Sequence, residues 1–315
     1  MNRKIILPLL ALALAIAACQ SQPAAPAPAT SVIPPAMDTT LPAVPTDTTV
    51  PVPPAPTSLT MDMLRNGTSH APAFDHSVTL VNGAYSNGSS TDPYSVQMLD
   101  LVAFGDLNGD GVGDAAILLV ENGGGTGQFE SVIVVLDSSG AATQAGEAQL
   151  GDRAQIKSMN IASGTLALDM LVQGPNDPMC CPSLAETQSY RLVANSLWLS
   201  RLTSLTPDNH ERSISIVSPA DNSTVSNPFT ISGSVTIAPF ENTLAYRIYL
   251  PDGTKVNESS LMVDSAGVAG GPGTFSQNID LSNAGISGPL IVQFLDLSTA
   301  DGTTLALGSV VLNLH

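Results

Sequence analysis

The pattern of apolar and polar positions divides the sequence into four stretches. Residues 1–18 contain an almost unbroken apolar run, and residues 19–58 show no hydrophobic period. Residues 59–208 and 209–315 consist of short apolar or alternating runs separated by turn residues. Such short runs are typical of β-strands, and no long amphipathic helix pattern competes with them. We therefore expect a mainly β protein with two folded domains after residue 58.

The stretch 59–208 predicts an antiparallel β domain, with an α+β fold left open. Short links at residues 162–164 and 194–196 contain the Ser, Gly and Asn residues that favour tight turns, so they predict hairpins. The expected strands are Ser77 to Val81, Val96 to Phe104, Ala115 to Val120, Ser131 to Leu136, Gln155 to Ile161, Thr165 to Leu171, Ser189 to Val193 and Leu197 to Leu202.

The stretch 209–315 changes to a rhythm of short alternating strands, with a turn at residues 251–253. About seven strands over about a hundred residues are typical of a β-sandwich. The expected strands lie in Ile214 to Pro219, Asn227 to Val235, Leu244 to Leu250, Gly273 to Ser276, Leu290 to Leu297 and Leu305 to Leu312.

The first residues have the pattern of an export signal. Met1–Lys4 is positively charged, and the apolar run Ile5–Ala18 ends at Cys19. That run is shorter than the roughly 20 residues that a membrane span needs. The segment Ile16–Cys19 resembles the lipobox of bacterial lipoproteins. The resemblance implies that Cys19 carries acyl chains, palmitate among them, and anchors the chain in the cell membrane or the outer membrane, facing outside the cytoplasm. An ordinary secretory signal with a chance cysteine is the alternative.

The stretch 19–58 is rich in Pro, Ala, Thr and Val, as in Pro23–Pro28 and Val50–Pro54, and cannot bury a core. Prolines favour an extended conformation of about 3.1 Å per residue, so this length of chain reaches on the order of 100 Å. It predicts a tether that spaces the domains from a membrane, or a passive disordered connector, which is physically the same object.

Within residues 59–208, oxygen-bearing positions alternate in a short run between two predicted strands. Gly111 would make the sharp turn of a calcium loop, but Ile117 stands where an EF-hand places its glutamate. The stretch Phe104–Gly111 resembles the calcium loop of FG-GAP repeats, in a single copy. The expected ligands of a structural calcium ion are Asp106, Asn108, Asp110, the carbonyl of Val112 and Asp114. A metal-free turn is the alternative, because Asp, Asn and Gly make tight turns unaided.

The adjacent cysteines Cys180 and Cys181 lie in a proline-rich loop. Export places them in an oxidising setting, which favours a disulfide between neighbours. Free thiols, dimer-linking bonds and metal thiolates remain open, although zinc sites need four Cys or His ligands and the chain has only four His. The Cys-Cys-Pro loop and the Gly105–Gly111 run also resemble an uncharacterised module of bacterial lipoproteins, which implies no known activity.

The motifs of residues 209–315 resemble the immunoglobulin-like domain of bacterial spore germination. The resemblance implies a binding or scaffolding module and brings no catalytic residues. It rests on Ser218-Pro219, Asn227-Pro228, Ile231–Gly233, Phe240–Asn242, Gly273–Phe275, Leu297-Ser298 and Asp301-Gly302.

The net charge of −17 reflects few Lys and Arg, and basic residues do not cluster with aromatics, so we expect no nucleic-acid partner. No complete catalytic set can be assembled. We therefore expect a non-enzymatic protein of the cell envelope with an unknown protein or polymer as its partner. The alternative is an envelope-polymer hydrolase, whose candidates would be Glu121, Glu130, Glu147 and His76.

Overall fold

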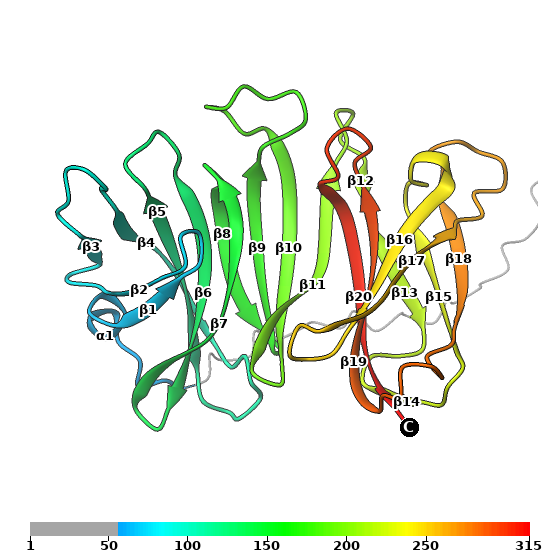
Figure 1. Cartoon of the computed structure of the whole chain (residues 1–315), viewed down its shortest axis with the longest axis horizontal. Coiled ribbons are helices and arrows are strands. Elements are labelled where there is room, and N and C mark those ends of the chain that lie inside the picture. The colour runs from blue at the N-terminus through cyan, green and yellow to red at the C-terminus, as the bar shows by residue number, and fades with distance from the viewer. Residues whose placement is uncertain (1–55) are drawn as a thin grey trace, which may run out of the picture. The chain divides into compact units, whose positions relative to one another are not determined.

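The structure is a computed structural model and describes residues 56–315. It is built almost wholly from β-strands, which confirms the mainly β prediction; the helices described are α1 (Met61–Arg65) and the short 3-10 turn η1 (Phe240–Asn242) (Figure 1). Neighbouring strands pair antiparallel, except that β14 (Ser223–Val225) runs parallel to β20 (Thr304–Leu314). The predicted signal, Cys19 and residues 19–55 of the predicted tether lie outside the described residues.

The first half contains a five-stranded sheet in the order β3-β4-β5-β6-β7. Its strands are β3 (Ala84–Ser86), β4 (Ser95–Gly105), β5 (Asp114–Asn122), β6 (Phe129–Ser138) and β7 (Ala141–Asp152). One face packs on the strands β8 (Gln155–Ala162), β9 (Thr165–Val172) and β10 (Leu184–Val193), and α1 with the hairpin β1 (Thr68–Ala71) and β2 (His76–Thr79) covers the other.

Two cores therefore lie on opposite faces of β5 and β6. Leu118 and Val132 belong to the core against β8–β10, whereas Ile117 and Ile133 belong to the core under α1 and the β1–β2 hairpin. Because both faces of these strands are buried, their sequences read as continuous apolar runs rather than alternating ones. This explains the predicted strands at residues 115–120 and 131–136.

Two hairpins confirm the predicted tight links. Ser163 and Gly164 connect β8 to β9 with φ of 49° and 72°. Ala194 and Asn195 connect β10 to β11 (Ser196–Leu205) with φ of 48° and 64°. Successive left-handed residues match the twist of antiparallel strands, which is why two-residue turns of this kind close hairpins.

The second half is a β-sandwich, as predicted. A three-stranded sheet of β13 (Ile214–Ser218), β15 (Phe229–Val235) and β18 (Gly273–Ile279) packs on β16 (Thr243–Tyr249), β19 (Gly288–Leu297) and β20. Phe294 lies fully buried between them. Strand β17 (Lys255–Met262) extends the second layer beyond β16.

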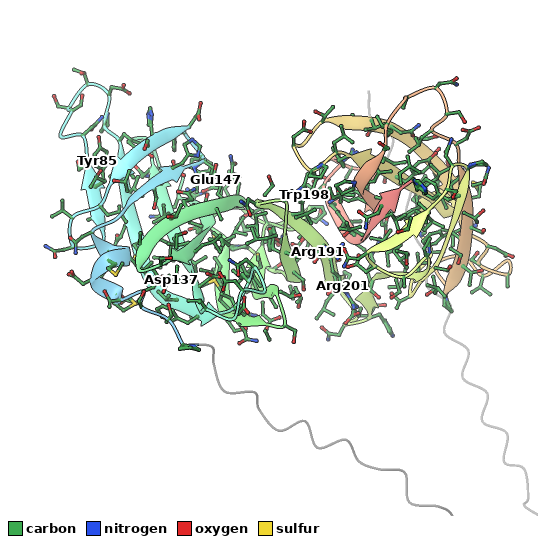
Figure 2. All side chains as sticks on the ribbon, turned by 90° about the horizontal axis from the view of Figure 1, so that it is seen from below. Tyr85, Asp137, Glu147, Arg191, Trp198 and Arg201 are labelled. Carbon is green, nitrogen blue, oxygen red and sulfur yellow. A yellow bond between two sulfur atoms is a disulfide. The ribbon has the colours of Figure 1, made fainter. Side chains whose placement is uncertain are left out.

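One hydrogen-bonded sheet runs through both halves, in the order β17-β16-β19-β20-β11-β10-β9-β8, with β12 (Glu211–Arg212) also pairing with β11. At the join, Leu202 of β11 lies opposite Leu307 of β20 and both pack on Leu295. Trp198 of β11, labelled in Figure 2, packs beside Tyr249 of β16, with the centroids of the two rings 5.4 Å apart. The predicted boundary at residues 208 and 209 falls in the turn between β11 and β12, and as a domain limit it stays a prediction.

Candidate functional site

The predicted lipidation residue, Cys19, lies outside the described residues. In the part of the chain that the structure describes, no helix combines the length and the apolar character that a membrane crossing requires. Anchoring through Cys19 therefore stays a prediction.

The loop between β4 and β5 carries the predicted calcium ligands. The carboxylate of Asp106 accepts a hydrogen bond from the backbone N–H of Gly111 at 2.9 Å. Asn108 Oδ1 accepts one from the N–H of Asp110 at 3.0 Å, and Asp110 Oδ1 accepts one from the N–H of Val112 at 2.7 Å. Gly111 has a φ of 82°, a left-handed conformation that glycine adopts without a steric penalty. Side-chain oxygens at alternate positions thus hold the loop in its folded shape.

Asp114, the last predicted ligand, is fully buried at the start of β5. Its two carboxylate oxygens accept hydrogen bonds from the N–H groups of Leu107 at 2.9 Å and Asp137 at 3.1 Å. Burial raises the pKa of Asp114 above its ordinary value, and the two N–H donors oppose that rise. Asp114 therefore lies in the interior, whereas Asn108 and Asp110 are exposed.

The chemistry of this loop fits calcium, because each of its predicted side-chain ligands offers an oxygen atom to a metal ion. The arrangement is divided, since Asp106, Asn108 and Asp110 lie in the outer loop and Asp114 is bound to backbone groups inside. Among residues 56–315, no three Asp, Glu, His or Cys side chains gather closely enough to hold a metal ion. The calcium site stays a prediction.

The first described residues lie against this loop, a contact that the sequence did not reveal. Asp137, labelled in Figure 2, accepts hydrogen bonds on Oδ2 from the N–H and the hydroxyl of Ser58, at 2.7 and 2.6 Å. These bonds hold the pKa of Asp137 below its ordinary value. The N–H of Gly113 donates to the carbonyl of Pro56 at 2.8 Å. An open hollow of about 530 Å3 lies between these residues, Asn108 and Asp110.

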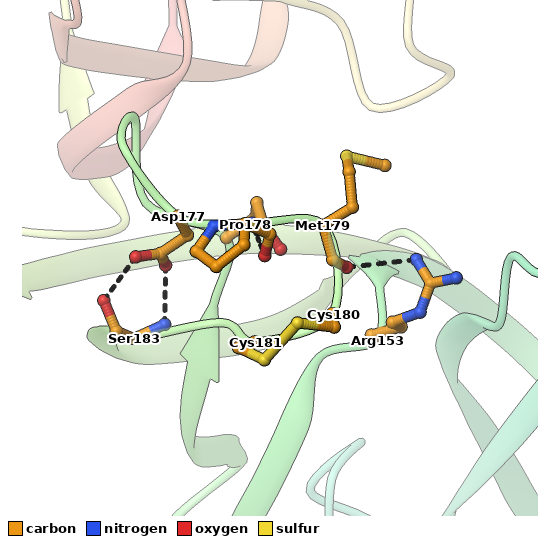
Figure 3. The surroundings of a disulfide bond; sticks show 8 residues. Arg153, Asp177, Pro178, Met179, Cys180, Cys181 and Ser183 are labelled. Carbon is orange, nitrogen blue, oxygen red and sulfur yellow. Dashed lines mark hydrogen bonds between the residues drawn. A yellow bond between two sulfur atoms is a disulfide. The ribbon is translucent and has the colours of Figure 1, made fainter.

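Cys180 and Cys181 are joined by a disulfide bond in an exposed loop between β9 and β10, with their Cα atoms 3.8 Å apart (Figure 3). Hydrogen bonds hold the loop at both sides of the pair. Asp177 accepts from the N–H and the hydroxyl of Ser183, at 2.7 and 2.6 Å, and Arg153 donates to the carbonyl of Met179 at 3.2 Å. The disulfide is therefore presented to solvent on a well-braced loop.

The carboxylates considered for hydrolysis lie on different strands and form structural hydrogen bonds. Glu121 of β5 is fully buried and accepts from the hydroxyl of Tyr94 at 2.9 Å and from the N–H of Ala73 at 2.8 Å. Glu130 of β6 accepts from the N–H of Ala154 at 2.8 Å, and burial raises its pKa to about 7. Glu121 thus fastens the β1–β2 turn to the sheet.

Glu147 of β7, labelled in Figure 2, takes part in a cluster that the sequence did not predict. His70 of β1 lies between two carboxylates, with Nδ1 at 2.6 Å from Glu147 and Nε2 at 2.9 Å from Asp75. These two bonds raise the pKa of His70 above its ordinary value. His76 packs on the ring of Tyr94, with ring centroids 4.6 Å apart. The structure does not bring His76 together with Glu121, Glu130 or Glu147 through any hydrogen bond.

Comparison with known proteins identifies one family likeness. Residues 213–303 match the immunoglobulin-like domain of bacterial spore germination, from the start of β13 to the turn before β20. This confirms the resemblance expected for the C-terminal half. No match to a curated protein was found. The lipobox and FG-GAP resemblances stay predictions.

Proposed function

We propose that this chain is a lipid-anchored protein on the outer side of a bacterial membrane, with a non-enzymatic binding or structural role in the cell envelope. The observation that carries the proposal is the family match at residues 213–303 on a β-sandwich, since immunoglobulin-like domains of this kind are typically non-catalytic. The anchor rests on the sequence of residues 1–19, and the partner would be an envelope protein or polymer rather than a nucleic acid.

Substitution of the lipidation residue tests the anchor. Cys19→Ala should move the full chain from the membrane fraction to the soluble fraction, because stable anchoring needs more than one acyl chain and all of them would be attached at this residue. Ser21→Ala is the matched control and should stay with the membranes. Retention of the Cys19→Ala chain after an alkaline wash would contradict the anchor.

Co-purification tests the binding role. The full chain in detergent, immobilised and mixed with envelope fractions, should retain a defined protein or polymer in the presence of calcium. A chain with the charge of one loop ligand removed, Asp110→Asn, shows whether that retention depends on the loop. Retention of nothing above a bare-resin control would argue against a binding role.

We propose further that the loop between β4 and β5 binds calcium with a structural purpose, bracing two strands. Calorimetry on the full chain in detergent should give a dissociation constant of about 10⁻⁴ to 10⁻³ M, the range of extracellular modules. Asp110→Ala should abolish the heat, and Asp92→Ala, an exposed carboxylate outside the loop, should leave it unchanged. Equal and silent titrations of all three chains would contradict the site.

A hydrolase acting on envelope polymers is the second candidate. It is favoured by one observation, the pKa of about 7 at the buried Glu130, because a general acid works best with a pKa near the operating pH. Release of soluble fragments from purified envelope polymers, lost in Glu130→Gln, would support it. No release by the unmodified chain would contradict it.

A further inference from the structure

Three hollows along the join between β11, β12 and β20 share their lining residues. The first, of about 180 Å3, and the second, of about 590 Å3, are both lined by Ala185, Ser204 and Leu205. The second and the third, of about 680 Å3, are both lined by Arg212 and Leu305. Neighbouring hollows share these walls, so the three lie next to one another along the join, and we call them together the junction groove.

Hydrogen bonds fix the middle of the junction groove. The hydroxyl of Ser204 donates to the carbonyl of Leu305 at 2.6 Å, and Ser204 pairs with Arg212 in the β11–β12 ladder. Arg212 Nη1 donates to the buried carboxylate of Asp296 at 2.8 Å. These contacts join strands from both halves of the sheet, so the groove is formed before any partner arrives.

The charges along the groove are mainly negative. Asp169 and Glu211 line the first hollow with Lys157, and Glu211 is also ion-paired with Arg201 at 3.4 Å. Asp177 lines the second hollow and Glu241 lines the third. The hydroxyls of Ser158 and Thr187 donate to Asp169 at 2.7 and 2.8 Å and hold its pKa below the ordinary value, so it stays ionised. The charge of Arg212 is offset by Asp296. A polyanion would therefore be repelled.

Apolar surface accompanies these carboxylates. Phe240 is 65 % exposed at the rim of the third hollow, and Leu205 is 37 % exposed in the first two. Phe240 is followed by Glu241 and Asn242, which adopt left-handed conformations with φ of 52° and 53°. Here they present an aromatic ring beside a carboxylate.

We propose that the junction groove binds an extended basic segment of a partner polypeptide. This inference rests on the proposed binding function and names its partner class. Lysine and arginine combine an aliphatic stem with a cationic end, so they match a groove that offers both apolar side chains and carboxylates. Phe240 is the one aromatic side chain among the groove-lining residues, which disfavours a glycan held by ring stacking.

Labelled peptides test the partner class on the full chain in detergent, at low salt. The probe is a fluorescent peptide of about twelve alternating lysines and threonines, which spans roughly 40 Å when extended. Matched peptides carry glutamine or glutamate in place of lysine, and a hexamer of N-acetylglucosamine represents a neutral glycan. Anisotropy should show the lysine peptide binding at least tenfold more tightly than the glutamine peptide.

Charge variants then locate the binding. Glu211→Gln with Glu241→Gln should weaken the lysine peptide about fivefold, because both carboxylates lie in the groove. Asp62→Asn with Asp92→Asn removes the same charge from exposed positions outside it and should change affinity less than twofold. Ala300→Trp fills the third hollow with an exposed side chain and should weaken binding without altering the fold.

The outcomes separate this inference from the proposed function. Equal losses in the two charge pairs would overturn the groove as the site. Tighter binding of the glycan or of the glutamine peptide would overturn the partner class, and so would binding of none of the probes. The co-purification from envelope fractions does not depend on these peptides. Failure of the peptide assay would therefore contradict the partner class of the groove and leave the proposed binding role to be tested separately.

Discussion

The buried carboxyl group of Glu186 should make the stability of this protein depend on pH near neutrality. It lies on β10, is 8 % exposed, and accepts a hydrogen bond from Gln188 Nε2 at 2.9 Å, while Gln188 Oε1 accepts one from the hydroxyl of Tyr190 at 2.5 Å. Burial raises the pKa of Glu186 from 4.5 to about 7, against the opposing effect of Gln188. The charged groups Lys157, Asp169 and Glu211 line the hollow next to it.

The sign follows from proton binding. In the unfolded chain this carboxyl loses its proton near pH 4.5, and in the folded chain only near pH 7. Its contribution to stability is therefore complete below about pH 4.5, declines between the two values and is lost above about pH 7. A difference of about 2.5 pKa units corresponds to about 3 kcal/mol of unfolding free energy at 1.36 kcal/mol per unit.

Glu186→Gln removes this ionisation and keeps the acceptor for Gln188. Urea unfolding between pH 5 and pH 8, followed by the fluorescence of the single tryptophan Trp198, measures the effect. The variant should lie within about 1 kcal/mol of the unmodified chain at pH 5 and exceed it at pH 8 by about 2 to 3 kcal/mol. Glu130 also has a pKa of about 7, so part of the pH dependence should persist. An unchanged loss of stability from pH 5 to pH 8 in the variant would refute the reasoning.

Three further changes have definite expected outcomes. Arg212→Ala leaves the carboxylate of Asp296 buried without its partner and should cost about 3 kcal/mol, more at pH 8 than at pH 5; an equal loss at both would contradict the assignment. Gly233→Ala places a Cβ 2.4 Å from the ring of Phe275 and 2.4 Å from the backbone carbonyl oxygen of Ser215, so it should lower the melting temperature by several degrees; an unchanged melting temperature would contradict this packing. Intact mass should show no alkylation of the Cys180–Cys181 pair before reduction and two additions after it, whereas labelling before reduction would indicate free thiols.

The strands that the sequence predicted best are those whose buried side chains produce a continuous or alternating apolar pattern. The apolar runs at residues 115–120 and 131–136 became β5 and β6, and alternation gave β15 and β16. The hairpin turns at residues 162–164 and 194–196 were predicted from residue types that tolerate left-handed conformations. In these places local preference and tertiary burial agree, so one sequence is enough.

Strands at sheet edges were missed for the opposite reason. β7 has only Ala, Gly, Thr and polar residues over most of its length and is held by pairing along β6. β17 is polar and largely exposed at the edge beside β16, and β1, β3 and β14 are too short to show a period. Only the second half of β10 was predicted, because polar residues at its start are buried in hydrogen bonds. Pairing with a distant strand leaves no local pattern to read.

The candidate sites divide in the same way. The Asp106–Asp114 loop was found from spacing alone, and the structure adds that its last carboxylate lies inside the protein. The hydrogen bonds between Ser58 and Asp137 join residues 79 positions apart in the sequence. The junction groove is lined by side chains of strands from β8 to β20. Neither has a motif, because each arises only when separate strands meet.

The pairing of β11 with β20 also bears on how such a protein can be inherited or recombined. Strand β11 is the edge of the first half and β20 is an edge of the second, and each pairs with the other. An unpaired apolar edge strand readily pairs with strands of other chains. A gene that encoded only one half would produce a protein with an exposed, unpaired sheet edge, which favours aggregation. Exchange of the C-terminal half between genes should therefore succeed only where the incoming segment brings a strand that can take the place of β20.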